Sequence, residues 1–322
     1  MNLWSTLALS AAIPLVLLGL ALTFGGPARP AAMDSIAAPF RGLDMSGLPP
    51  PGTVRARDGQ TLVYRRYEPG TAVRGSVTLV HGSSASSESL HPMAQALAAA
   101  GWQVWALDMR GHGGSGTRGQ IGHVDQLDED LADFVAAVQP AAPATLAGFS
   151  SGGGFVLRIA GGPQQALFQS YLLLSPFLGQ DASTHRPDSG GWVKVGVPRL
   201  VALSLLDRLG VRAFHHLPVT RFALDEAARA RLTEAYDYAL STNFRPPADH
   251  QATMRAAQRP VALLVGANDE AFRPERYADE VAQAGQRWPV RVLPGLGHIA
   301  LTLDATAHAA TIEALAALQA GG

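Results

Sequence analysis

An apolar run from Thr145 to Phe149 leads into Gly148-Phe149-Ser150-Ser151-Gly152, and a stretch of helix-like composition follows at once. This is the G-x-S-x-G pattern of a sharp turn between a strand and a helix. Glycines flank such a turn because larger side chains would clash there, and the serine between them is left accessible. The unpaired N–H groups at the start of the helix point to the same place. The pattern predicts a reactive Ser150, but a chain with 34 glycines can also form it by chance.

Strand and helix patterns alternate on both sides of this turn. Residues 54–64 carry an Asp58-Gly59 turn between alternating strands, which predicts a hairpin. Further strands are expected at 75–80, 104–107, 145–149, 171–176, 261–266 and 290–293, and helices at 89–100, 125–138, 274–284 and 304–318. This alternation predicts an α/β fold with a mostly parallel central sheet and helices on both faces.

The alternation stops between 177 and 259, where no clear strand pattern is present. This segment contains two apolar stretches, Trp192 to Leu209 and Val211 to Leu224. We expect a helical cap inserted after one strand of the sheet. The first apolar stretch is expected to form cap core, an acyl-chain wall, or both.

The N-terminal residues form a separate unit. Leu3 to Phe24 is almost wholly apolar, and ~20 such residues suffice to cross a bilayer. No Lys or Arg precedes the segment, in contrast to the usual basic start of a signal peptide. We expect residues 1–25 to be a transmembrane anchor in a hydrophobic helix, with a cleaved export signal as the alternative and a buried core helix as the third option. Residues 26–52, rich in Gly, Pro and Ala, are expected to be a linker.

Composition excludes several classes of function. The net charge is −1 and Lys194 is the only lysine, so the chain has no basic run of the kind that binds nucleic acid. The absence of cysteine removes cysteine nucleophiles, disulfides and thiolate metal sites. The adjacent His215 and His216 point in different directions in any regular structure, so they are not expected to share an ion. We expect no cofactor and no metal ion.

Chemically active residues follow several of the predicted strands. Ser150 follows one strand, Asp269 and Glu270 another, and His298 the last, while His81-Gly82-Ser83 follows the strand at 75–80. Ligands of an open parallel sheet bind at the carboxyl ends of its strands. A serine, an acid and a histidine at one edge of one sheet together indicate nucleophilic catalysis.

The order Ser, Asp, His on an alternating chain resembles the α/β-hydrolase fold. The resemblance covers residues 53–322, with the cap insertion at about 177–259. The stretch that begins at Asp108-Met109-Arg110-Gly111-His112 and ends at Arg118-Gly119 resembles the D-x-R-G-H-G-x-S-x-G-x-R-G sequence of monoacylglycerol lipases and bacterial lysophospholipases in the serine-aminopeptidase-like branch. Ser175-Pro176 before the cap is similar to that branch as well. Ser151 departs from it, because the branch carries Met at this position.

The resemblance implies a role for each residue. Ser150 is the nucleophile, His298 the base, and Asp269, rather than its neighbour Glu270, the acid that orients the histidine. The backbone N–H groups of Ser83 and Ser151 are the expected oxyanion donors. His81 and Gly82 are expected to shape the oxyanion loop, and Asp108 and His112 to fix their own loop by hydrogen bonds.

The expected function is hydrolysis of carboxylic esters, with a small acyl ester or lipid as substrate and the N-terminal segment at a membrane. A peptidase or amidase that uses the same residues is the first alternative. A non-catalytic protein of the same fold that binds a hydrophobic ligand is the second. Ser150 disfavours dehalogenases and epoxide hydrolases, which carry Asp at this position.

Overall fold

A computed structural model of the chain describes residues 3–33, 38–40 and 42–320, with the backbone alone for residues 3–11. Eight strands form the main sheet in the order β1-β2-β4-β3-β5-β6-β10-β11. The hairpin of β1 and β2 is antiparallel, and β2 pairs antiparallel with β4, whereas the remaining neighbours are parallel. The predicted hairpin and the mostly parallel sheet are therefore confirmed. The strands are Gly52–Arg55 (β1), Thr61–Tyr67 (β2), Ser76–Val80 (β3), Gln103–Leu107 (β4), Ala144–Phe149 (β5), Ser170–Leu174 (β6), Val261–Gly266 (β10) and Val290–Leu293 (β11).

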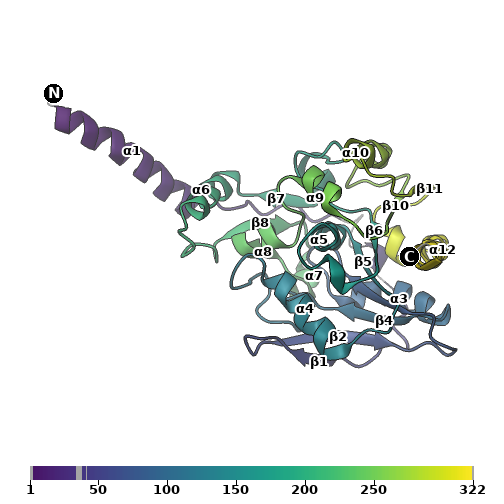
Figure 1. The fold of residues 1–322 in the computed structure, drawn as a ribbon. Coiled ribbons are helices and arrows are strands. Elements are labelled where there is room, and N and C mark those ends of the chain that lie inside the picture. Colours follow the sequence, from purple (N-terminus) through teal and green to yellow (C-terminus); the bar gives the residue numbers. More distant parts are fainter. Residues whose placement is uncertain (1–2, 34–37, 41, 321–322) are drawn as a thin grey trace.

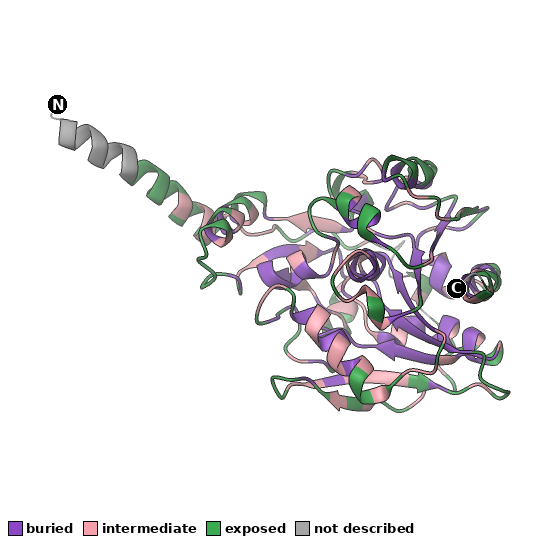
Figure 2. Ribbon diagram, viewed as in Figure 1, coloured by how far each residue is buried: buried purple, intermediate pink, exposed green. Residues whose placement is uncertain are grey.

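Helices cover both faces of this sheet (Figure 1). Because β3, β5, β6 and β10 are buried along their whole length, they form the centre of the core, as Figure 2 shows. On one face α3, α11 and α12 contact one another, and on the other α9 contacts both α5 and α10. The helices are His91–Ala99 (α3), Gln126–Val138 (α4), Ser151–Ala160 (α5), His250–Ala256 (α9), Tyr277–Gln283 (α10), Ala300–Leu303 (α11) and Ala305–Ala320 (α12).

The inserted segment between β6 and β10 was expected to be a helical cap, but it is not purely helical. It contains helices and also a small antiparallel sheet in the order β7-β8-β9. The prediction failed because these strands are only three to five residues long, too short to show an alternating pattern. The elements of the cap are Val193–Val195 (β7), Val197–Arg208 (α6), Pro218–Phe222 (β8), Glu226–Arg231 (α7), Ala235–Asp237 (β9) and Tyr238–Asn243 (α8).

The predicted hydrophobic helix is present as α1, Leu3–Phe24, and it projects from the body beside α6 (Figure 1). Arg199 joins the two helices, because its guanidinium donates hydrogen bonds to the carbonyls of Leu22 and Thr23 at 2.9 and 3.0 Å. These carbonyls are among those that the end of a helix leaves unpaired, and a cation is favourable there. The predicted linker that follows lies against the cap, since Met33 N–H bonds to the Ala223 carbonyl at 3.0 Å.

Within the described part of the chain, no helix combines the length and the apolarity needed to cross a membrane. The side chains of residues 1–11 lie outside that part. The predicted anchor or signal at residues 1–25 therefore stays a prediction.

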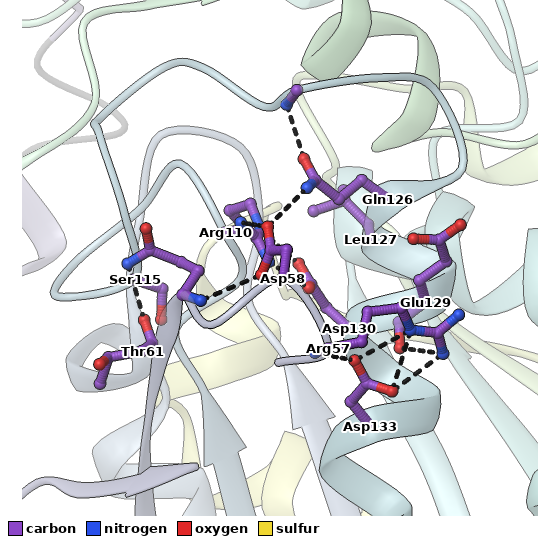
Figure 3. A network of polar contacts seen from close by, with 12 residues as sticks. Arg57, Asp58, Thr61, Arg110, Ser115, Gln126, Leu127, Glu129, Asp130 and Asp133 are labelled. Carbon is purple, nitrogen blue, oxygen red and sulfur yellow. Dashed lines mark hydrogen bonds and ion pairs between the residues drawn. The ribbon is translucent and has the colours of Figure 1, made fainter. Parts of the chain in front are cut away.

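The loop after β4 is held by a network of charges (Figure 3). Arg110 donates to both oxygens of Asp130, at 2.8 and 2.6 Å, and to both oxygens of Asp58, at 2.7 and 3.1 Å. The hydrogen bonds from Arg110 hold the pKa of Asp58 below its usual value. Arg57 forms a second, more exposed pair with Asp133 at 2.9 Å. Because Arg110 and Asp130 are both buried, this contact anchors the loop to α4.

We expect Arg110→Gln to lower the free energy of unfolding by about 3–5 kcal/mol, because it leaves the buried carboxylate of Asp130 without its cation. Arg57→Gln is the matched control, because Arg57 is solvent-exposed. Loss of its ion pair with Asp133 should lower the free energy of unfolding by about 1 kcal/mol or less. Urea denaturation of both variants measures the difference. Equal losses in the two variants would contradict this account of the loop.

Candidate active site

The turn between β5 and α5 has the backbone geometry that the sequence predicted. Ser150 has φ 56° and ψ −119°. This conformation is energetically unfavourable for any residue other than glycine. The flanking glycines are required by close backbone contacts. A Cβ at Gly148 would lie 2.4 Å from the carbonyl oxygen of Gly152, and one at Gly152 would lie 2.3 Å from that of His81. The turn therefore presses α5 against the end of β3 and presents Ser150 at the edge of the sheet.

The structure brings Ser150, His298 and Asp269 together. Ser150 Oγ lies 3.0 Å from His298 Nε2, and His298 Nδ1 lies 2.8 Å from Asp269 Oδ2. All three side chains are buried, and the ring of His298 is enclosed by Phe149 and Phe272 at centroid distances of 4.6 and 5.2 Å. This is the hydrogen-bonded arrangement in which a histidine can take the proton of a serine.

The two adjacent acids have different contacts. Asp269 Oδ1 accepts hydrogen bonds from the N–H groups of Ala271 and Phe272, both at 2.8 Å, while Oδ2 faces His298. Burial raises the pKa of Asp269, but the charge and hydrogen bond of His298 outweigh it, so this pKa lies below its usual value. Glu270 instead accepts the backbone N–H of His298 at 2.9 Å. Asp269 thus contacts the imidazole, and Glu270 fixes the loop that carries it.

The two expected oxyanion donors lie beside the serine. Ser83 and Ser151 line the same pocket as Ser150. Ser151 is the first residue of α5, where a backbone N–H has no partner within the helix. Among the described residues, the N–H of Ser83 makes no hydrogen bond either. Two free N–H groups next to a serine can bind the negative oxygen of a tetrahedral intermediate.

His81 and His112 are buried as neutral rings beside the loop that carries Ser83. Burial lowers the pKa of both, so each ring donates from one nitrogen and accepts at the other. His81 Nδ1 lies 2.7 Å from the Gly82 carbonyl, and its Nε2 accepts the N–H of Met109 at 3.2 Å. Asp108 likewise fixes its loop, because it accepts the N–H groups of Ser87 and Gly114 at 2.8 and 2.9 Å.

The cap holds the oxyanion loop from the other side, which the sequence did not reveal. Tyr236 Oη accepts the N–H of Ser84 at 2.6 Å and lies 2.6 Å from His112 Nε2. Burial raises the pKa of Tyr236, so its hydroxyl keeps the proton that it donates to His112. Trp192 Nε1 also donates to Ser83 Oγ at 2.9 Å. These residues stand in the cap with no motif around them that could have pointed to this role.

A pocket of about 350 Å³ lies between the cap and the edge of the sheet, and Ser150 and His298 line it. The run that begins at Trp192 contributes to both cap core and pocket wall, because Leu203 is fully buried whereas Trp192 and Val195 face the pocket. Polar and apolar side chains both line the pocket, and its apolar part comprises Phe177, Trp192, Val193, Val195, Val197, Phe222, Phe244, Ala271 and Phe272. Such a lining suits a hydrocarbon chain.

The described residues hold no group of three or more His, Asp or Glu side chains that could bind a metal ion. His215 and His216 do not converge on one partner. His215 Nε2 lies 3.1 Å from Asp207 Oδ1, and His216 Nδ1 lies 3.1 Å from the Ala213 carbonyl.

Comparisons with known proteins agree with this architecture. The Hydrolase_4 family, described as serine aminopeptidase, S33, matches residues 71–302. A monoacylglycerol lipase of Mycolicibacterium smegmatis is 40% identical over 104 residues, which is 30% of this chain and 36% of that protein. The chain thus spans about a third of that relative.

Solved structures show the same fold at low sequence identity. A soluble variant of monoglyceride lipase from Saccharomyces cerevisiae, with a substrate analogue bound, has a TM-score of 0.65 at 17% identity and covers 87% of this chain and 98% of its own. The monoacylglycerol lipase of Paleococcus ferrophilus has a TM-score of 0.60 at 22% identity, covering 80% and 99%. The fold is that of an α/β-hydrolase.

Tyr236→Phe should destabilise the protein by about 1–3 kcal/mol, because it leaves the buried N–H of Ser84 and Nε2 of His112 without their partner. Tyr238→Phe is the matched control in the same cap, since its hydroxyl lies a long 3.5 Å from Ser204 Oγ. Thermal unfolding of the two variants tests the difference. If Tyr236→Phe unfolds at the same temperature as Tyr238→Phe, the hydroxyl does not hold the loop.

Proposed function

The chain belongs to the serine aminopeptidase, S33, family of α/β-hydrolases, and from this premise we propose that it is a serine hydrolase that cleaves carboxylic esters of lipid-like acyl substrates. The observation that carries the proposal is the contact of 3.0 Å between Ser150 Oγ and His298 Nε2 at a strained turn that opens into the pocket.

The proposed reaction runs in two halves. His298 takes the proton of Ser150 as Oγ attacks the acyl carbon, and the oxyanion binds the N–H groups of Ser83 and Ser151. His298 then returns the proton to the leaving alcohol, which departs and leaves an acyl ester on Ser150. Water enters, loses a proton to His298 and attacks this ester, and the carboxylic acid leaves as Ser150 regains its proton. Asp269 remains ionised throughout and stabilises the imidazolium.

The apolar pocket wall supports an acyl chain as the part of the substrate that it binds. Relatives that are named as monoacylglycerol and monoglyceride lipases support the same class of substrate. The lysophospholipase, monoacylglycerol lipase and carboxylesterase types share this chemistry.

A peptidase or amidase is the second candidate, favoured by the description of the family as serine aminopeptidase. An aminopeptidase must bind the positive amino group of a peptide, which calls for an unpaired carboxylate near the nucleophile. Asp188 is the acidic residue of the pocket wall, and it already pairs with Lys194. The charges of the pocket therefore favour the ester hydrolase.

We also propose that the N-terminal segment holds the protein at a membrane, with export after cleavage as the alternative. The supporting observations are the apolar sequence from Leu3 to Phe24 and the exposure of the apolar residues in the described part of α1, among them Leu15, Leu17 and Phe24. A group of exposed apolar side chains of this size is typical of a surface that contacts a membrane or another protein.

A serine-reactive fluorophosphonate probe should label the purified protein, and Ser150→Ala should abolish labelling because it removes the attacking oxygen. Ser151→Ala is the matched control, since it keeps the backbone N–H that the mechanism uses and should still be labelled. Labelling that survives Ser150→Ala would refute the assignment of the nucleophile.

Turnover separates the candidate functions. Activity on p-nitrophenyl esters without activity on aminoacyl-p-nitroanilides supports the ester hydrolase, and the reverse supports the peptidase. A well-folded protein that neither reacts with the probe nor hydrolyses any acyl ester would instead be a binding protein of this fold.

Deletion of residues 1–25 should move the protein from the membrane fraction of expressing cells to the supernatant after high-speed centrifugation, while fluorophosphonate labelling persists. The physical reason is the loss of the apolar segment, whose burial in lipid would otherwise hold the protein there. A full-length protein found in the supernatant, with its N-terminus intact by mass spectrometry, would contradict the anchor.

A further inference from the structure

One charged side chain of the pocket has no role in the mechanism above. Arg245 lines the pocket together with Ser150 and His298. It follows the end of α8 and stands between Phe244 and Pro246, which are both buried. Phe244 packs against the rings of His81 and His112, so the backbone that carries Arg245 is fixed to the core of the site.

Arg245 has no partner for its charge. Among the residues that the structure describes, no acidic side chain forms an ion pair with it and no hydrogen bond involves its guanidinium. Asp188, the acidic residue of the pocket wall, is occupied by Lys194. Asp181 attracts Arg245 only from beyond contact distance.

Two other arginines with largely buried side chains are paired with acids. Arg110 binds Asp58 and Asp130, and Arg158 binds Asp125 and Asp128. Burial is the main cause that lowers the pKa of Arg245; the charge of Arg158 adds to this shift, and that of Asp181 opposes it. A guanidinium keeps its charge in proteins regardless, so the site retains a positive charge that faces a cavity.

We propose that Arg245 binds an anionic group of the substrate, so that the preferred substrates are acyl esters that also carry a carboxylate or a phosphate. The planar guanidinium fork matches both groups and can donate two parallel hydrogen bonds to either. Gln180 and Ser241 also line the pocket and offer further polar contacts beside the apolar wall. This inference rests on the proposed ester hydrolase function and names the substrate class for it.

The test compares pairs of ester substrates in which one member carries an additional anionic group. One pair is the mono-p-nitrophenyl ester of a dicarboxylic acid and the neutral p-nitrophenyl ester with the same chain length. The other pair is a lysophosphatidic acid and the monoacylglycerol with the same acyl chain. The wild type should have the higher kcat/KM for the anionic member of at least one pair, and which pair shows the preference distinguishes a carboxylate from a phosphate.

Arg245→Gln should lower kcat/KM for the preferred anionic ester by about 10- to 100-fold, the loss expected when a hydrogen bond to a charged group is removed. Its kcat/KM for the neutral member should change by less than about 3-fold. Arg245→Lys keeps the charge without the fork and should fall between the two. Arg255→Gln is the matched control, since it removes an exposed arginine of α9 outside the pocket and should leave both values unchanged.

A wild type without preference for either anionic ester overturns the inference, and so does a parallel loss on both members of a pair in Arg245→Gln. Fluorophosphonate labelling at the wild-type rate in the same variant would then show that the hydrolase function stands. Should Arg245→Gln fail to fold, the charge preference of the wild type and its reduction in Arg245→Lys decide the question.

Discussion

The close approach of backbone at the turn after β5 is the constraint on which the site depends. Gly148 and Gly152 let α5 begin directly against the ends of β3 and β5, where no side chain would fit. This places Ser150, the first N–H of α5 and the loop after β3 within one small volume. The strain at Ser150 is tolerated because the sheet and helices around it are deeply buried. A looser turn would separate the serine from the donors that its chemistry requires.

The residues at the strand ends could be predicted because each follows a short segment with the composition of a strand. Ser150, Asp269 and His298 converge for that reason alone, and a family resemblance then separated Asp269 from Glu270. The cap could not be predicted in the same way. Its strands are too short for a periodic signal, and Tyr236 and Trp192 reach the oxyanion loop through tertiary contacts that leave no pattern in sequence.

The cap contributes both to the pocket and to the loop that carries Ser83. It walls the pocket with apolar side chains, and it fixes the loop that carries Ser83 through hydrogen bonds from Trp192 and to Tyr236. In the proposed mechanism, substrate binding and stabilisation of the oxyanion therefore draw on the same elements. Changes in the cap that alter selectivity are also expected to alter the rate of the chemical step.

The attachment of α1 to Arg199 has a mechanical consequence. Because the guanidinium holds both the end of α1 and the carbonyl of Pro218, a force on α1 is transmitted to α6 and β8 rather than to the central sheet. Val197 stands in the same first turn of α6 and lines the pocket. The helix that anchors α1 is therefore also a helix that forms part of the pocket wall.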